Sequence, residues 1–132
     1  MKKDIDFPEV TGVKVAIAKS VNSLGESEWN VYLINKNLIA LDNIMIVSKG
    51  VENSNGDGRR TSTLRHAIPR VEEQSFGKVE AISPEVFSFH NEFWVSFFIL
   101  NQLFDKKFVV VPFNEFEISL IPEIELNGQL AI

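Results

Sequence analysis

Apolar and polar residues alternate with a period of two along much of this chain. In residues 12–20, Val13, Val15 and Ile17 face one way and the residues between them face the other. Successive side chains of a strand point to opposite faces of its sheet, so this pattern predicts a half-buried strand. Similar patterns or short apolar runs predict further strands at residues 28–36, 43–50, 61–68, 76–82, 92–100 and 107–112, with one or two more in 113–121 and 123–132.

Two of these segments are especially rich in aromatic and β-branched residues. Glu92–Leu100 has the sequence EFWVSFFIL and Lys107–Pro112 has the sequence KFVVVP. Continuous apolar runs are typical of strands that are buried on both faces. The sequence therefore predicts a hairpin of two buried strands, with a turn at residues 101–106.

Turn-forming residues separate the predicted strands. The longest such stretch, residues 51–60, contains Asn55-Gly56 and Asp57-Gly58, which supply the positive φ values that tight turns require. We expect Pro69 to end the strand at 61–68. Residues 83–85, Ser-Pro-Glu, resemble the start of a helix, with room for about one turn.

Seven to nine short strands with regular turns favour two packed sheets. We therefore expect one all-β domain over residues 1–132: a single antiparallel two-sheet β-sandwich, immunoglobulin-like or similar. A closed β-barrel is the alternative. No repeat or change in composition indicates a second domain.

Composition and charge narrow the classes of function. The chain has 18 acidic against 13 basic residues, and this net charge of −5 argues against general nucleic-acid binding. It has no cysteine, which excludes disulfides, thiolate zinc sites and cysteine nucleophiles. No apolar stretch approaches the ~18 residues that span a bilayer, and no secretory signal is visible. We expect a cytoplasmic protein with no cofactor, no nucleic-acid partner and no membrane partner.

The aromatic residues admit two interpretations. Eleven of them are Phe, which brings apolar area without a polar atom, so most rings are expected in the core. Five mid-strand rings could instead stack sugars, although we expect them to be core: Trp29, Tyr32, Trp94, Phe97 and Phe98. Exposure of Phe87, Phe89 or Phe104 would indicate a partner surface or a homodimer interface.

The loop at residues 53–61 is the predicted ligand site. Its candidate residues are Asp57, Arg59 and Arg60, because guanidinium groups beside two glycines can receive a phosphate or another anion. The loop also partly matches a calcium loop, but Leu64 stands where a bidentate Glu is needed. A flexible turn between strands is the simpler interpretation.

The catalytic and metal-binding signals are weak. His66 alternates with apolar neighbours, so we expect a core or boundary histidine, and we expect His90 in a turn. A metal site would require the fold to bring the two together, and we expect none. No Gly-x-Ser-x-Gly elbow is present. The carboxylate pairs are expected on a charged solvent face: Glu115 with Glu117, and Glu123 with Glu125.

Two strand segments also carry a family resemblance. Trp29–Asn35, WNVYLIN, together with Lys107–Phe113, KFVVVPF, resembles small bacterial β-sandwich proteins described as related to the phenylalanyl-tRNA synthetase alpha subunit. The resemblance covers the middle and the end of the chain and depends on core-strand motifs. It implies a β-sandwich fold and carries no activity or site residue over to this chain.

These observations favour a non-enzymatic β-sandwich domain that acts through contacts with another protein or with itself, as a homo-oligomer. A small-ligand or carbohydrate-binding module that uses the loop at 53–61 is the alternative. An enzyme with a site around His66 or His90 is a third hypothesis, and it would need one of these histidines in a deep pocket beside a carboxylate.

Overall fold

Strands account for most of residues 10–132, the part of the chain that this computed structural model describes. The only helix in that part is one turn of 3₁₀-helix, which Ser83 caps by accepting a hydrogen bond from the backbone N–H of Glu85. The elements are β1 (Val13–Val21), β2 (Ser27–Asn35), β3 (Leu41–Val51), β4 (Leu64–Val71), β5 (Ser75–Ala81), η1 (Pro84–Val86), β6 (His90–Ile99), β7 (Gln102–Val110), β8 (Ser119–Ile121) and β9 (Leu126–Leu130). This single helical turn is much too short to cross a bilayer.

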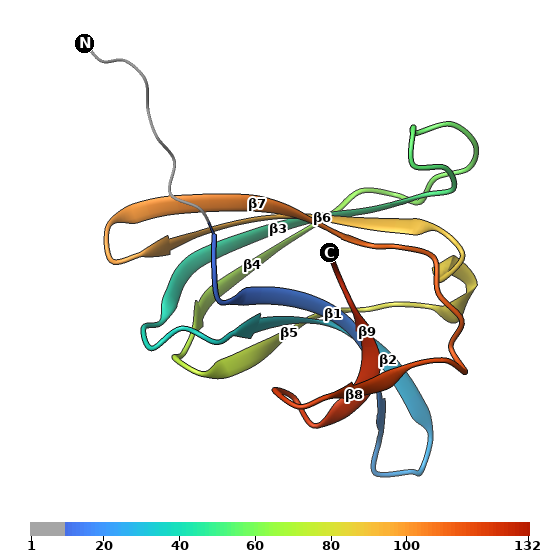
Figure 1. Ribbon diagram of the computed structural model, residues 1–132, viewed down its shortest axis with the longest axis horizontal. Helices are drawn as coiled ribbons and strands as arrows, with labels where there is room; N and C mark the ends of the chain where they lie inside the picture. Colours follow the sequence, from blue (N-terminus) through green and yellow to red (C-terminus); the bar gives the residue numbers. More distant parts are fainter. Residues whose placement is uncertain (1–9) are drawn as a thin grey trace.

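The strands form two antiparallel sheets that lie one above the other (Figure 1). The five-stranded sheet has the order β5-β2-β1-β9-β8, and the four-stranded sheet has the order β4-β3-β6-β7. The predicted all-β, two-sheet sandwich is therefore confirmed. The alternative of one closed sheet is wrong, because each sheet ends in two edge strands within the described residues.

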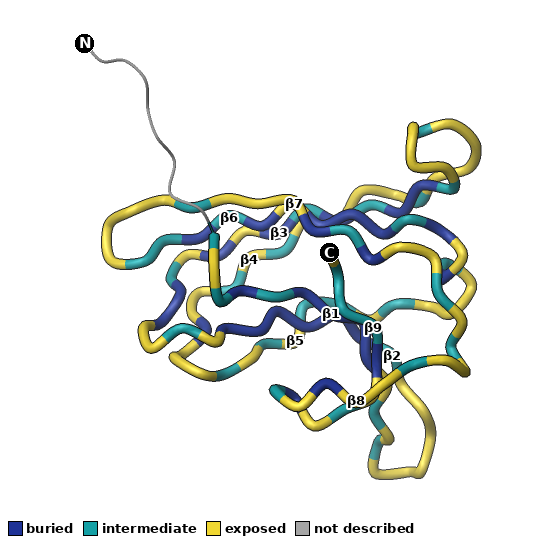
Figure 2. Tube along the Cα trace, viewed as in Figure 1, coloured by how far each residue is buried: buried dark blue, intermediate teal, exposed yellow. Residues whose placement is uncertain are grey.

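The main core fills the space between the two sheets, where Figure 2 shows the buried positions of both layers facing each other. The largest fully buried side chains include Phe93 and Phe97 of β6, and Phe108 of β7 is also buried. Phe87 and Phe89 form no exposed patch, because their side chains are buried as well, at 3% and 8% exposure. Five of the ten Phe residues in the described part are thus buried, and Phe104 and Phe113 pack against the main core.

The predicted hairpin forms, but its turn is shorter than expected. β6 and β7 pair from Asn91 with Val110 to Ile99 with Gln102, so the turn is only Leu100-Asn101, with φ of 56° at Leu100. Residues 102–106, which the pattern places in the turn, instead lie within β7, including the charged residues Asp105 and Lys106. They fit there because β7 is an edge strand, where charged side chains face solvent and discourage further pairing.

Pro69 does not end its strand, contrary to the prediction. β4 begins at Leu64 and continues to Val71, and Pro69 lies opposite the irregular position Asn43 of β3. A proline has no backbone N–H to donate, and an edge strand with a local irregularity tolerates it. β4 is such an edge strand.

A second core covers the outer face of the five-stranded sheet. Ala16 and Ala18 of β1 and Tyr32 and Ile34 of β2 point away from the main core, yet each is at most 3% exposed. β8 and the turn that follows it fold over them and contribute the side chains Ile121 and Ile124. The predicted strands at 113–121 and 123–132 are accordingly reduced to three and five residues.

Two features hold this C-terminal segment in place. β9 approaches β1 so closely that a side chain at position 128 would collide with the backbone of Ile17 and Ala18, so Gly128 is required. The Glu123 carboxylate, in the turn between β8 and β9, lies 3.1 Å from Lys14 Nζ and 3.3 Å from Lys36 Nζ.

Replacement of Glu123 by Gln should lower the free energy of unfolding by about 1–2 kcal/mol at neutral pH, because both ion pairs are lost. The pKa of the Glu123 carboxyl is lowered from 4.5 to about 2, first by a hydrogen bond from its own backbone N–H and then by Lys14 and Lys36. This stabilisation is complete above a pH of 4.5 and is lost as the pH falls toward 2. Urea unfolding measured across that range tests the expectation.

Glu125→Gln is the matched control, because the Glu125 carboxylate forms no ion pair with residues 10–132. Its stability should fall with acid as that of the unchanged protein does. If Glu123→Gln lost stability on acidification as steeply as the unchanged protein, the ion pairs would not be the cause.

Candidate functional site

The predicted ligand residues all lie in the loop between β3 and β4, which projects from one end of the sandwich (Figure 1). Arg59 donates from Nε and Nη2 to Glu52 Oε2, at 2.9 and 2.7 Å. Arg60 Nη2 donates to the backbone oxygen of Gly56, at 3.0 Å. Asp57 accepts a hydrogen bond from the side chain of Asn55, at 3.1 Å.

These contacts give the three residues a role within the loop itself. The carboxylate of Glu52 balances the charge of Arg59, and hydrogen bonds from Arg59 lower the pKa of that carboxyl below its usual value. The guanidinium of Arg59 also lies 5.4 Å from the ring of Phe89. The loop is therefore closed by an internal ion pair, and an incoming anion would have to compete with Glu52 for Arg59.

We expect millimolar inorganic phosphate or calcium to leave the melting temperature unchanged, because these loop groups already bind one another. A ligand that binds the folded state would raise it. Differential scanning fluorimetry tests this at constant ionic strength. Stabilisation by phosphate that disappears in Arg59→Gln, but persists in the exposed control Arg65→Gln, would instead make the loop an anion site.

The two histidines lie far apart. His66 pairs with Ile46 and His90 pairs with Val51, so five residues of β3, or roughly 17 Å, separate their levels in the sheet. No group of three His, Asp or Glu side chains in residues 10–132 is arranged to hold a metal ion. His66 is a half-buried boundary residue, while His90 opens β6 rather than lying in a turn.

His66 belongs to a polar cluster between the two sheets. Glu80 of β5 accepts a hydrogen bond from the hydroxyl of Ser48 on β3, at 2.7 Å. His66 Nε2 lies 3.0 Å from the same oxygen, Oε1 of Glu80. The Glu80 side chain is only 10% exposed. The carboxylate therefore stands between the hydroxyl and the imidazole, which is not the order of a hydrolytic triad, where the imidazole contacts the hydroxyl.

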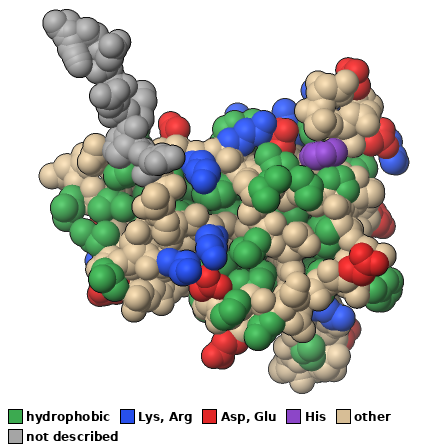
Figure 3. Space-filling model, viewed as in Figure 1, with side chains coloured by type: hydrophobic (Ala, Val, Ile, Leu, Met, Phe, Trp, Pro, Cys, Tyr) green, Lys and Arg blue, Asp and Glu red, His purple; other side chains and the backbone are tan. Residues whose placement is uncertain are grey.

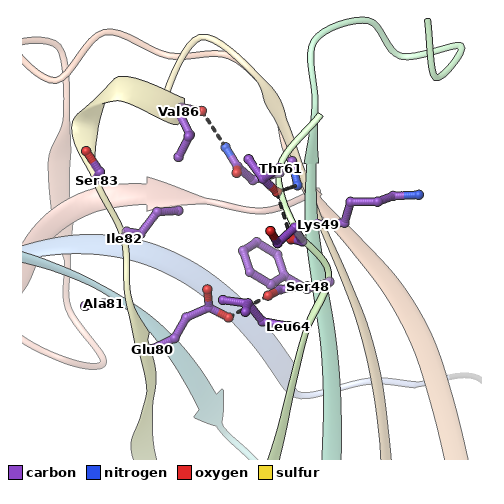
Figure 4. Close-up of a pocket in the computed structure, with 13 residues that line it drawn as sticks. Ser48, Lys49, Thr61, Leu64, Glu80, Ala81, Ile82, Ser83 and Val86 are labelled. Atoms are coloured by element: carbon purple, nitrogen blue, oxygen red, sulfur yellow. Dashed lines mark hydrogen bonds between the residues drawn. The ribbon is translucent and has the colours of Figure 1, made fainter. Parts of the chain in front are cut away.

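This cluster faces a pocket of about 180 Å³ near η1 (Figure 4). The pocket lies where the edges of the two sheets, β4 and β5, meet. Apolar walls come from Leu64, Ile82, Val86 and Phe93. Figure 4 shows Glu80 and Ser48 joined at its base, whereas the side chain of Lys49 points away from them.

A β-bulge turns Glu80 into this pocket. On β5, Lys78 pairs with Tyr32 and Glu80 pairs with the adjacent Val31, so Val79 is an extra residue. Tyr32 faces the outer core and Val31 the main core, and the bulge therefore moves Glu80 to the inner side. Simple alternation would place Glu80 with Lys78, on the outer side.

A second candidate site lies on the outer face of the four-stranded sheet. Trp94 of β6 lies on this face and is 37% exposed, and Met45 of β3, nearby, is 46% exposed. Beside the indole is a hollow of about 370 Å³ whose lining includes Met45, Val47, Ser96 and Asp105. Trp94 was expected in the core, so this prediction was wrong for Trp94, although it holds for Tyr32 and Phe97.

Charged side chains surround Trp94. The ammonium groups of Lys107 and Lys49 lie 5.0 and 5.5 Å from the centre of its ring, within the range of cation–π attraction. Lys107 also contacts the Glu92 carboxylate at 3.3 Å. In Figure 3, blue side chains gather along the upper margin of the molecule, over β6 and β7.

No family model, curated protein or solved structure matches this chain. The resemblance to synthetase-related β-sandwich proteins therefore stays a prediction.

The sequence contains a pattern that indicates on which face of its sheet Trp94 lies, but none that indicates this for Glu80. In the run of residues 93–97, the odd positions are Phe, Val and Phe, whereas the even positions are Trp and Ser. Ser96 therefore marks the polar face and assigns Trp94 to it. The orientation of Glu80 depends on a bulge, and a bulge is set by pairing with a distant strand.

Proposed function

We propose that the protein is a non-enzymatic interaction domain that forms a homodimer through the outer face of its four-stranded sheet. The observation that carries the proposal is the half-exposed Trp94 beside the hollow that includes Ser96. When two copies meet across a two-fold axis, the bulky ring of each copy can enter the recess beside the ring of the other.

The strand register supports such an axis. Val95 of β6 pairs with Lys106 of β7. A two-fold axis that lies between the two facing sheets, perpendicular to the strands and level with this pair, places Trp94 of one copy opposite Ser96 of the other. It also places Val47 of β3 opposite Met45 of the second copy, because Ile46 pairs with Val95 at that level. Both contacts occur twice by symmetry, once in each direction.

Charge supports the same arrangement. Asp105 and Lys107 lie one residue on either side of Lys106 along β7. The proposed axis therefore brings Asp105 of each copy opposite Lys107 of the other. Opposite charges in such positions fix the orientation of an interface and oppose other alignments.

The size of the face indicates a weak dimer. Four strands and about seven residues per strand give a face of about 19 Å by 23 Å, or roughly 450 Å² per copy. Stable complexes bury about 800 Å² on each side. We therefore expect association only at high protein concentration.

The other elements of the proposal rest on the sequence. The net charge of −5 supports a protein partner over nucleic acid, and a chain without cysteine fits the reducing cytoplasm. The loop at 53–61 gives less support to the ligand-binding alternative, because Arg59 is engaged by Glu52.

Trp94→Ala should abolish concentration-dependent association, because it removes the ring that fills the recess. Sedimentation equilibrium over a range of concentrations measures this, with circular dichroism as the check that the variant folds. Phe116→Ala is the control: Phe116 is 86% exposed and lies outside the sheets, so its loss should not change association. A monomer at every concentration would overturn the proposal.

Exchanging charges on β7 tests the orientation. Asp105→Lys and Lys107→Glu should each weaken self-association, because each places like charges opposite one another across the axis. A mixture of the two single variants should associate, since each interchain pair is then oppositely charged, and so should the double variant. Association of both single variants at the original strength would contradict the proposed axis.

A further inference from the structure

The pocket near η1 holds a carboxylate that the surrounding protein satisfies on one side only. Glu80 Oε1 accepts the Ser48 hydroxyl and lies close to His66. Oε2 makes no hydrogen bond or ion pair with residues 10–132. The Glu80 side chain is nine-tenths buried, so these contacts replace most of its hydration. A buried carboxylate of this kind is stabilised by a cation.

No lysine or arginine of the described residues supplies that cation. Lys49 lines the pocket, but its side chain points away from Glu80 (Figure 4). The imidazole of His66 contacts Oε1, which leaves Oε2 as an open acceptor.

We propose that this pocket binds a small organic cation, a primary ammonium group on a short apolar chain. The ammonium would donate to Glu80 Oε2, and the chain would lie against Leu64, Ile82 and Val86. At about 180 Å³ the pocket is smaller than the ~300 Å³ lower limit of drug-sized sites, so the ligand has few non-hydrogen atoms.

The surroundings favour a cation over other small ligands. Apolar walls lower the local dielectric constant, which strengthens attraction between the carboxylate and an ammonium group and repels an anion. The ring of Phe93 lines the same pocket and can add a cation–π contact. A neutral alcohol of the same shape would contact the same apolar walls, but its hydroxyl would donate an uncharged hydrogen bond to Glu80 in place of an ion pair.

Titration of the full chain with n-butylammonium, followed by backbone-amide NMR, tests the proposal. Saturable shifts at roughly millimolar ligand are expected for amides that line the pocket, including Ser62, Ile82 and Ser83. n-Butanol and butyrate match the probe in shape but are neutral and anionic, and neither should produce saturable shifts there. Equal binding of n-butanol, or the absence of saturable shifts with n-butylammonium, would overturn the proposal.

Glu80→Gln keeps an oxygen for the Ser48 hydroxyl and removes the charge, so it should weaken binding of n-butylammonium at least tenfold. Glu73→Gln removes an exposed carboxylate just after β4 and is the matched control, with unchanged affinity. An undiminished affinity in Glu80→Gln would exclude Glu80 as the counter-ion. If Glu80→Gln fails to fold, the comparison of the three probes on the unchanged protein decides. Neither readout depends on dimer formation, because the pocket lies between the sheets and not on the outer face.

Discussion

The burial of β1 and β2 on both faces is the constraint on which this fold depends. Val15 and Ile17 pack against the four-stranded sheet, while Ala16 and Ala18 on the opposite side are also fully covered. A two-layer sandwich leaves its outer faces to solvent, so this second apolar face needs a further cover. The C-terminal segment supplies the cover, and its position follows from that need.

The two outer faces of the sandwich are consequently different. The chain covers the face of the five-stranded sheet itself, with Ile121 and Ile124. The face of the four-stranded sheet has no such segment over it among residues 10–132, and there Trp94 lies among lysines and beside Ser96. A half-polar surface of this kind is compatible with a free monomer and still offers an apolar contact, as is typical of surfaces that form transient complexes.

Local patterns were sufficient to predict the layers but not the details of pairing. Alternation identified β1, and the apolar runs identified β2 and β6, because the two-residue period of a strand can be recognised from a few adjacent residues. The predicted ends of β4 and β7 are wrong because Pro69 and the charged residues 105 and 106 are tolerated on edge strands. Which strand lies at an edge depends on the whole topology, which short-range patterns do not contain.

The candidate sites differ in the same way. Trp94 could be assigned to the outer face from its even position beside Ser96, once the run of residues 93–97 is divided into two faces. The inward orientation of Glu80 could not, because it follows from the extra residue Val79 opposite β2. Similarly, Arg59 is recognisable as a loop cation, but its pairing with Glu52 depends on how the loop closes.

The bulge at Val79 makes the chemistry of the pocket depend on chain length as well as on residue identity. Removal of Ala81, which follows Glu80, would let β5 pair with β2 without a bulge, so that Val79 lies opposite Val31 and Glu80 lies opposite Asn30, on the other layer. Removal of Val79 would instead leave Glu80 opposite Val31. Among sequences that diverge from this one, the position of a single-codon deletion along this strand therefore decides whether the cavity keeps its carboxylate.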